Sequence, residues 1–267
     1  QYEHTKNHDL LNIIGVSYHE GLGTKQNYNK AMIYYNKAID NGSALAYGNK
    51  GLLFELGLGV DLNFSKAFSL YKKGHELNDE FSSLNLGLLY LDGNGVKQNK
   101  EYGLKLIALA DKKGELQATL NLGHLYYEGD KVAQNYKLAM KYYKKASELK
   151  DALGFHRIGY MYDLGNGIDK DLNLAMQFYI KATDFGSSES AYNLGLIYLD
   201  KDTKNYNLFS ALEYFQKARE LGDNLANIKI DVVKKQIENL EIAQNTLGQN
   251  KETLRGLIID NKKENLI

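Results

Sequence analysis

A short motif recurs every 36 residues along most of this 267-residue chain. Its skeleton, seen in segment 122–129, is an apolar residue, a glycine, an aromatic residue three positions later and a second glycine three further on. The motif glycines are Gly15, Gly51, Gly87, Gly123, Gly159 and Gly195, with no insertion or deletion between copies. A fixed period of this length predicts an array of structural repeats in which each unit packs chiefly on its neighbours.

Other columns of the repeat predict two helices in each unit. We number positions by their distance after the motif glycine. Position 3 is aromatic, positions 16 and 23 are small, and position 20 reads Tyr35, Tyr71, Ile107, Tyr143, Tyr179 and Phe215. Spacings of three and four place these residues on one helix face. Because glycine inside a helix costs about 1 kcal/mol relative to alanine, we expect the second helix to approach the first closely at the motif glycine, with the aromatic columns filling the core.

The remaining glycines are expected to end helices. A Gly-x-Gly follows the first helix in four copies, but a dinucleotide-binding loop would need a preceding strand and a third glycine. Left-handed caps explain these glycines and those after the second helix better. The chain then divides into a polar lead-in (1–9), a repeat region (10–222) and a C-terminal segment without the period (223–267).

The pattern Ala-x-x-x-Leu-Gly-x-x-Tyr-x-x-Gly-x-Gly-Val, followed by Lys-Ala-x-x-Tyr-Tyr-x-Lys-Ala, resembles the Sel1-like repeat over residues 10–222. The resemblance implies an all-α fold, a right-handed α-α solenoid of six helix-turn-helix repeats related to tetratricopeptide arrays. It also implies a non-enzymatic adaptor or scaffold that binds a protein, in bacterial envelope signalling, host interaction and virulence, or in eukaryotic quality control. Local departures are Gly103 and Ile107 in the third copy, Lys131 in the fourth loop, and Lys201 and Thr203 in the sixth, which is expected to differ in shape.

By analogy with tetratricopeptide arrays, positions 1 and 4 of each first helix are expected to line a concave groove that takes a protein or peptide partner. The position 1 residues are Val16, Leu52, Leu88, His124, Tyr160 and Leu196. The position 4 residues are His19, Glu55, Leu91, Tyr127, Asp163 and Leu199. Much of this set is apolar, and contiguous exposed apolar surface often marks a binding site.

The C-terminal segment allows two interpretations. Ile230, Val233, Ile237, Leu240, Gln244 and Leu247 follow heptad spacing with one polar member. Gly248 then suggests a break, and Leu254, Leu257 and Ile258 suggest another helix. The segment is either a helical cap on the last repeat, which solenoids need, or a coiled-coil arm for self-association or for a partner helix.

Composition excludes several classes of function. Lys plus Arg equals Asp plus Glu at 33 each, so no basic excess attracts nucleic acid. The chain has no cysteine, so it has no thiolate metal site or cysteine nucleophile. The chain has no run of about 18 apolar residues, which is the length needed to span a bilayer. An initial glutamine follows either a removed signal peptide or an excised boundary, and the first would favour a periplasmic, surface-associated or secreted protein.

The sequence has few candidate metal-binding or catalytic residues, and none of them forms a complete motif. His4 and His8 have a possible metal-ligand spacing but no further ligands nearby, so no metal and no cofactor are expected. Glu20, Asp92, Glu128 and Asp200 recur at the end of the first helix, where a solvated rim is the simplest interpretation. His124 and His156 are expected to be ordinary groove or surface residues. The alternative functions are an enzyme acting on a cell-wall or glycan substrate through acidic pairs, and a structural oligomer assembled through residues 223–267.

Overall fold

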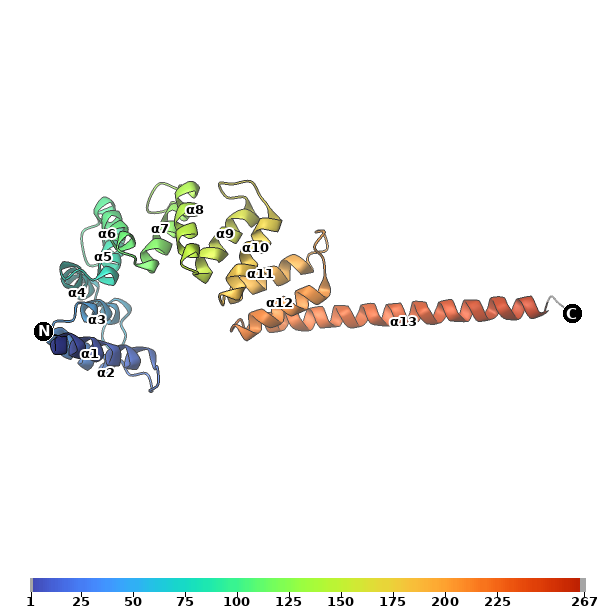
Figure 1. Ribbon diagram of the computed structural model, residues 1–267, viewed down its shortest axis with the longest axis horizontal. Helices are drawn as coiled ribbons and strands as arrows, with labels where there is room; N and C mark the ends of the chain where they lie inside the picture. The colour runs from blue at the N-terminus through green and yellow to red at the C-terminus, as the bar shows by residue number, and fades with distance from the viewer. Residues whose placement is uncertain (1, 265–267) are drawn as a thin grey trace. The chain divides into compact units, whose positions relative to one another are not determined.

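The computed structural model describes the backbone of residues 2–264 and the side chains of residues 9–243, 245 and 246. That part of the chain contains thirteen helices and no strand (Figure 1), and α1–α12 are the six helix pairs that the repeat pattern predicted. The helices are α1 (Tyr2–Glu20), α2 (Tyr28–Asp40), α3 (Ala44–Leu56), α4 (Phe64–Glu76), α5 (Glu80–Asp92), α6 (Lys100–Lys112), α7 (Leu116–Glu128), α8 (Tyr136–Glu148), α9 (Ala152–Leu164), α10 (Leu172–Asp184), α11 (Ser188–Leu199), α12 (Leu208–Glu220) and α13 (Ala226–Glu264). Helix α1 begins inside the segment expected to be a lead-in, and the side chains of His4 and His8 lie outside the described residues.

The chain forms two compact units, residues 1–146 and 147–267. In the first unit α1 packs on α2, α3 on α4 and α5 on α6, and in the second α9 packs on α10 and α11 on α12. These are the two helices of one repeat, so the all-α arrangement of successive helix pairs is confirmed. Within its described residues, the chain has no helix both long and apolar enough to cross a membrane.

Side-chain caps fix where the helices begin. The residue at position 12 caps the second helix of each repeat: Asn27, Asn63, Asn99, Asn135, Asp171 and Asn207 accept hydrogen bonds from backbone N–H groups two or three residues later. Ser43, Asp79, Glu115, Asp151 and Ser187, at position 28, cap the next first helix in the same way. A short polar side chain at this place satisfies N–H groups that the helix leaves free. The 36-residue period therefore encodes the helix starts as well as the core.

The motif glycines lie against position 20, as the spacing predicted. A Cβ atom on Gly123 would lie 2.6 Å from the ring of Tyr143, and one on Gly195 would lie 2.7 Å from the ring of Phe215. The position 20 side chains are fully or almost fully buried, and the small residues at positions 16 and 23 are buried with them. Only a residue without a side chain allows this approach, which explains a glycine inside each first helix.

In the third repeat the two helices come close together through different residues. A Cβ atom on Gly87 would lie 2.7 Å from the carbonyl oxygen of Gly103, and one on Gly103 would lie 2.6 Å from the carbonyl oxygen of Gly87. Helices α5 and α6 thus touch through their backbones. Ile107 is buried beside them, and its smaller side chain fits the reduced space.

Backbone conformation at the turns agrees with the glycine pattern. Gly57 ends α3 with φ 66°, in the left-handed region, and the other loop glycines of the first five repeats are similar. Asn78 and Lys150 replace glycine after α4 and α8, yet they keep positive φ values of 65° and 60°. The sixth loop differs as expected, because Asp200, the residue that follows α11, has a negative φ of −74°.

Helix α13 is both a cap and an extension. Ala226, Ile230 and Val233 are buried in one cluster with Phe215 of α12, and Ile237 packs on its edge. This section covers the last repeat as a cap should. The expected break at Gly248 is wrong, because α13 is one continuous helix to Glu264. Residues 254–258 belong to it, and their side chains lie outside the described residues.

Candidate partner-binding surface

Position 4 of the first helix faces the core rather than a groove in most repeats. Tyr71 Oη donates a hydrogen bond of 2.5 Å to Glu55 Oε2, and Tyr179 Oη donates one of 3.4 Å to Asp163. His19 Nδ1 lies 3.2 Å from Tyr35 Oη. In the first, second and fifth repeats, position 4 therefore partners the hydroxyl of position 20.

The structure corrects the expected exposure of two position 4 residues. His19 and Leu91 are buried, with exposed fractions of 7% and 1%. Leu91 belongs to the hydrophobic cluster around Ile107. Leu199 packs on the cluster around Phe215, and Tyr127 is half-buried with its ring edge-on to Tyr136.

Position 4 varies together with position 20. The two repeats without a tyrosine hydroxyl have leucine at position 4, in the pairs Leu91 with Ile107 and Leu199 with Phe215. The four repeats with a tyrosine have a polar residue there. A buried hydroxyl needs a partner and a buried carboxylate needs a donor, so the two positions change as a pair. The sequence already contains this paired change, but it becomes visible only when the residues at position 4 are compared with those at position 20.

Burial sets the protonation of these pairs. It raises the pKa of the Tyr71 phenol far above its ordinary value, and the charge of Glu55 acts in the same direction. Burial also raises the pKa of Tyr179, with Asp163 adding to it. The pKa of Glu55 is raised by burial as well, although the hydrogen bond from Tyr71 opposes this. The tyrosines thus remain protonated donors.

Position 1 remains at the surface. Val16, Leu52, Leu88 and Tyr160 are half-buried, and His124 and Leu196 are exposed. In the first unit α3 contacts both α1 and α5, and Asn49 donates a 2.9 Å hydrogen bond to Asn12 across the α1–α3 contact. Val16, Leu52 and Leu88 therefore lie at equivalent places on adjoining helices.

Two first helices expose a row of apolar side chains on this face. On α3 the row is Leu45, Leu52 and Leu56, spaced seven and four residues apart, and its two ends are 48% and 55% exposed. Such spacing puts all three on one side of a helix. We call this the α3 strip, and the equivalent Leu153, Tyr160 and Leu164 of the second unit the α9 strip, whose leucines are 39% and 49% exposed.

The same positions of α7 carry polar residues, namely Gln117, His124 and Glu128. His124 Nδ1 lies 3.7 Å from Glu128 Oε1, and both side chains are exposed to water. The repeat therefore does not require apolar residues here. On α3 and α9 they are apolar, and the leucines at both ends of each row stay exposed.

The residues considered for catalysis are dispersed. Glu20, Asp92, Glu128 and Asp200 are all exposed at helix ends. His156, expected at a surface or in a groove, is instead buried, with Nδ1 2.8 Å from Ser190 Oγ. Ser190 has no exposed surface, so it cannot meet a substrate. Among the side chains that the structure describes, no group of three His, Asp or Glu residues could hold a metal ion.

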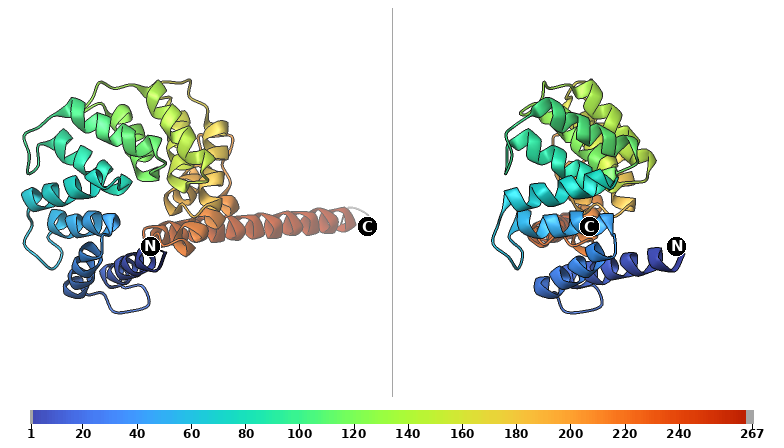
Figure 2. Two further views of the ribbon diagram at one scale, coloured as in Figure 1. Left: turned by 60° about the vertical axis from the view of Figure 1, so that its left-hand side comes forward. Right: turned by 90° about the vertical axis from the view of Figure 1, so that its left-hand side faces the viewer.

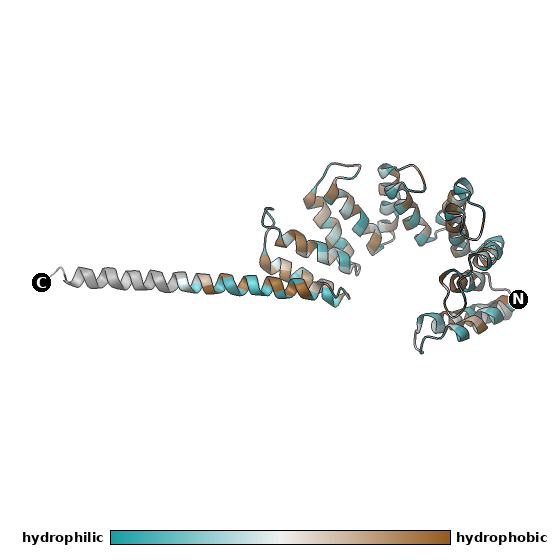
Figure 3. Ribbon diagram, turned by 180° about the vertical axis from the view of Figure 1, so that it is seen from behind, coloured by the Kyte–Doolittle hydropathy of each residue, from teal (hydrophilic) through white to brown (hydrophobic). Residues whose placement is uncertain are grey.

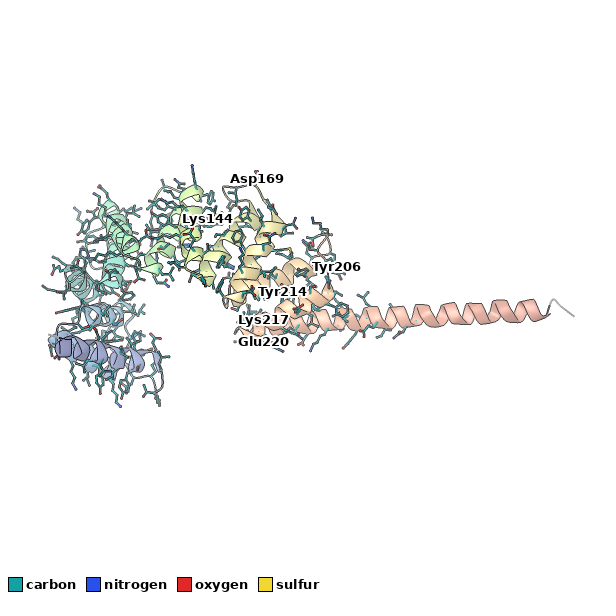
Figure 4. The ribbon with its side chains drawn as sticks, in the orientation of Figure 1. Lys144, Asp169, Tyr206, Tyr214, Lys217 and Glu220 are labelled. Atoms are coloured by element: carbon teal, nitrogen blue, oxygen red, sulfur yellow. The ribbon has the colours of Figure 1, made fainter. Side chains whose placement is uncertain are left out.

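A polar hollow of about 390 Å³ lies between the ends of α10 and α12 in the second unit. Tyr214, Lys217 and Glu220 of α12 contribute to its lining (Figure 4). Lys217 Nζ lies 3.8 Å from Glu220 Oε2, and both side chains are about half exposed. Its other carboxylates, Asp184 and Glu213, are exposed too. These are all solvated surface groups.

Comparison with known families identifies the repeat. The model of the Sel1 repeat matches residues 11–43, 44–79, 82–112, 116–151, 156–186 and 188–223, which is most of the chain. A search of the curated proteins finds no match.

Solved structures share the fold. A Sel1 repeat protein from Oxalobacter formigenes is 27% identical, with a TM-score of 0.66, over 83% of this chain and 86% of that one. The antigen c5321 of uropathogenic Escherichia coli, described as having an SLR fold, is 23% identical with a TM-score of 0.62. The match covers 85% of this chain but only 48% of that protein. The immunity protein Pa5087 from Pseudomonas aeruginosa is 20% identical, with a TM-score of 0.59 over 80% of this chain and 81% of that one.

Proposed function

Because this chain belongs to the Sel1 repeat family, whose members commonly mediate protein–protein interaction, we propose that it is an adaptor that binds protein through exposed apolar strips, the α3 strip in the first unit and the α9 strip in the second. Each strip by itself binds an apolar segment of a protein partner. The observation that carries the proposal is the exposure of Leu45 and Leu56 at positions where α7 has Gln117 and Glu128. Contiguous exposed apolar surface often marks a protein-interaction site.

Under this proposal, some of the residues expected in the groove belong to the two strips and others support the core. Leu52 and Tyr160 are the centres of the two strips, with Val16 and Leu88 beside Leu52 on the adjoining helices. Interface energy concentrates in a few central residues, often aromatic ones, so Tyr160 is the expected anchor of the α9 strip. Glu55 and Asp163 instead hold core tyrosines.

A bacterial envelope or host-interaction setting is part of the same proposal. It is supported by the resemblance to the Sel1-like repeat and by the description of c5321 as a protective antigen of uropathogenic strains.

Affinity capture with strip variants tests the binding site. Leu56→Glu places a charge in the α3 strip at an already exposed position, so the fold should survive and a captured partner should be lost. Ile33→Glu is the matched control, because Ile33 is 52% exposed on the second helix α2. We expect Leu56→Glu to weaken binding by about tenfold or more, and Ile33→Glu to leave it unchanged. If Leu56→Glu, Leu164→Glu in the α9 strip and the control Ile33→Glu all capture the partner equally well, the proposed surface is refuted.

A further inference from the structure

A buried histidine lies where the fifth and sixth repeats meet. His156 of α9 is 1% exposed, and its Nδ1 lies 2.8 Å from Oγ of Ser190 on α11. Its ring also lies against that of Tyr179 of α10, with 5.6 Å between the ring centroids. Helix α10 packs against both α9 and α11, and Figure 2 shows these three helices, yellow-green to yellow-orange, side by side. The imidazole is therefore held among three helices from two repeats.

The other repeats have no histidine at this position. His156 stands three residues before the motif glycine, where the other repeats have Asn12, Gly48, Leu84, Leu120 and Tyr192. At the border of the third and fourth repeats the residues equivalent to His156 and Ser190 are Leu84 and Ala118, which are buried in one hydrophobic cluster. Figure 3 shows apolar and polar residues interspersed along the helices of the repeats. Stacking of the repeats thus does not require an ionisable side chain here.

The hydrogen bonds around His156 suit a neutral ring. Ser187, the N-cap of α11, donates a 3.0 Å hydrogen bond from its Oγ to Ser190 Oγ. The hydroxyl proton of Ser190 is then directed to Nδ1 of His156, which acts as the acceptor. This leaves the imidazole proton on Nε2, 3.5 Å from Glu189 Oε1. A proton added at Nδ1 would take away the acceptor of the Ser190 hydroxyl, which has no exposed surface.

Burial of the ring opposes its protonation and lowers the pKa of His156 below its ordinary value. Glu189 of α11 acts against this shift, and Arg157 of α9 acts with it. The Glu189 side chain is 67% exposed, so water weakens its attraction for a charged ring. Tyr160 and Tyr179 add little attraction for a cation, because the first ring centroid is 6.3 Å away and the second ring is tilted by 39°. The folded chain therefore favours the neutral imidazole.

We propose that His156 is a pH switch between the fifth and sixth repeats, and that its protonation loosens the contact of α9 with α11. The inference goes beyond the adaptor proposal and does not depend on it, because it requires no partner. The pKa of His156 is lower in the folded chain than in a locally opened one. The stability that the neutral ring contributes is thus fully present above the unfolded pKa of about 6.5 and is lost as pH falls toward the folded pKa.

Amide hydrogen exchange of the full chain at about pH 7.5 and about pH 5.5 tests the switch, because these values lie on either side of the unfolded histidine pKa. After correction for the intrinsic effect of pH on exchange, protection of α11 should fall by roughly five- to tenfold at the lower pH. Helix α7 is the internal reference, since Leu84 and Ala118 form its border with the preceding repeat. Its own His124 is 55% exposed, so protonation there should not favour opening. An unchanged α11, or an equal loss in α7 and α11, would overturn the proposal.

A double variant replaces the switch with the apolar pair of another border. His156→Leu combined with Ser190→Ala copies Leu84 and Ala118, and its α11 should be equally protected at both pH values. His124→Leu is the matched control and should keep the loss seen in the unmodified chain. If the double variant still loses protection at the lower pH, another group is responsible and the proposal is wrong. The comparison of α7 with α11 in the unmodified chain decides the question even if the double variant is too unstable to measure.

Discussion

The second and third repeats have the same helix bounds relative to the motif glycine, but their cores use opposite chemistry. The second places a tyrosine hydroxyl against a carboxylate, Tyr71 on Glu55, beside Gly51. The third replaces both polar groups by Ile107 and Leu91 and brings two backbones into contact. The comparison shows that what the repeat preserves is a match between positions 4 and 20, and that either an apolar or a polar pair can supply it.

The largest effect should come from the backbone contact of the third repeat. Gly87→Ala puts a methyl group against the carbonyl oxygen of Gly103, which cannot rotate away, and we expect a loss of about 3 kcal/mol in the free energy of unfolding. Gly51→Ala meets the ring of Tyr71 instead, which can tilt, so its cost should be smaller. Denaturant unfolding followed by circular dichroism measures both.

Gly23→Ala is the control for this test, because no atom lies within 4 Å of its added methyl and only the positive φ of 68° opposes it. We expect a loss of about 1 kcal/mol there. If Gly87→Ala costs no more than Gly23→Ala, the close contact of α5 and α6 is absent in solution.

The polar pair should behave as one unit. Glu55→Leu leaves the Tyr71 hydroxyl without its acceptor and should cost about 1 to 3 kcal/mol. Adding Tyr71→Phe should restore most of this, since the double variant copies the Leu199 and Phe215 pair of the sixth repeat. A double-mutant cycle on unfolding free energies gives the coupling. Additive effects would mean that the two residues do not interact.

The apolar pair allows the reverse experiment. Phe215→Tyr introduces a hydroxyl opposite Leu199 and should cost about 1 to 2 kcal/mol, the penalty for a buried polar group without a partner. Leu199→Glu combined with it should recover part of the loss in thermal unfolding. Such a recovery would show that a polar pair can replace the apolar pair of the sixth repeat. A combined variant less stable than either single variant would mean that the polar pair works only in the repeats that already have tyrosine.

The smallest effect should be a dependence on pH. The pKa of Glu55 is raised in the folded chain by burial, so the contribution of this group is fully present below its unfolded pKa of about 4.3 and is lost as pH rises through the higher folded pKa. The unmodified chain should therefore lose stability, relative to the Glu55→Leu and Tyr71→Phe double variant, as pH rises above about 4.3. Unfolding midpoints at several pH values would show it, and a constant difference would contradict the raised pKa.

The period of 36 was enough to predict the helix pairs and the core columns, because three- and four-residue spacings state which face of a helix is buried. Position 4 was assigned to a groove by analogy, so the inward direction of His19 and Leu91 was missed. Comparing columns 4 and 20 would have revealed it. The α3 strip could not be singled out, because the sequence does not state how much of Leu45 or Leu56 stays exposed. Gly248 was taken as a stop, but one glycine costs only about 1 kcal/mol in a helix.

The two kinds of contact described above differ in how freely they can change during evolution. Positions 4 and 20 lie sixteen residues apart within one repeat, so a duplicated or recombined unit carries both members with it. Contacts such as His156 with Ser190, or Lys145 with Asp111, join residues 34 apart in different repeats. A repeat can therefore exchange its internal pair without any change in its neighbours, whereas a new order of repeats must preserve the matches at their borders.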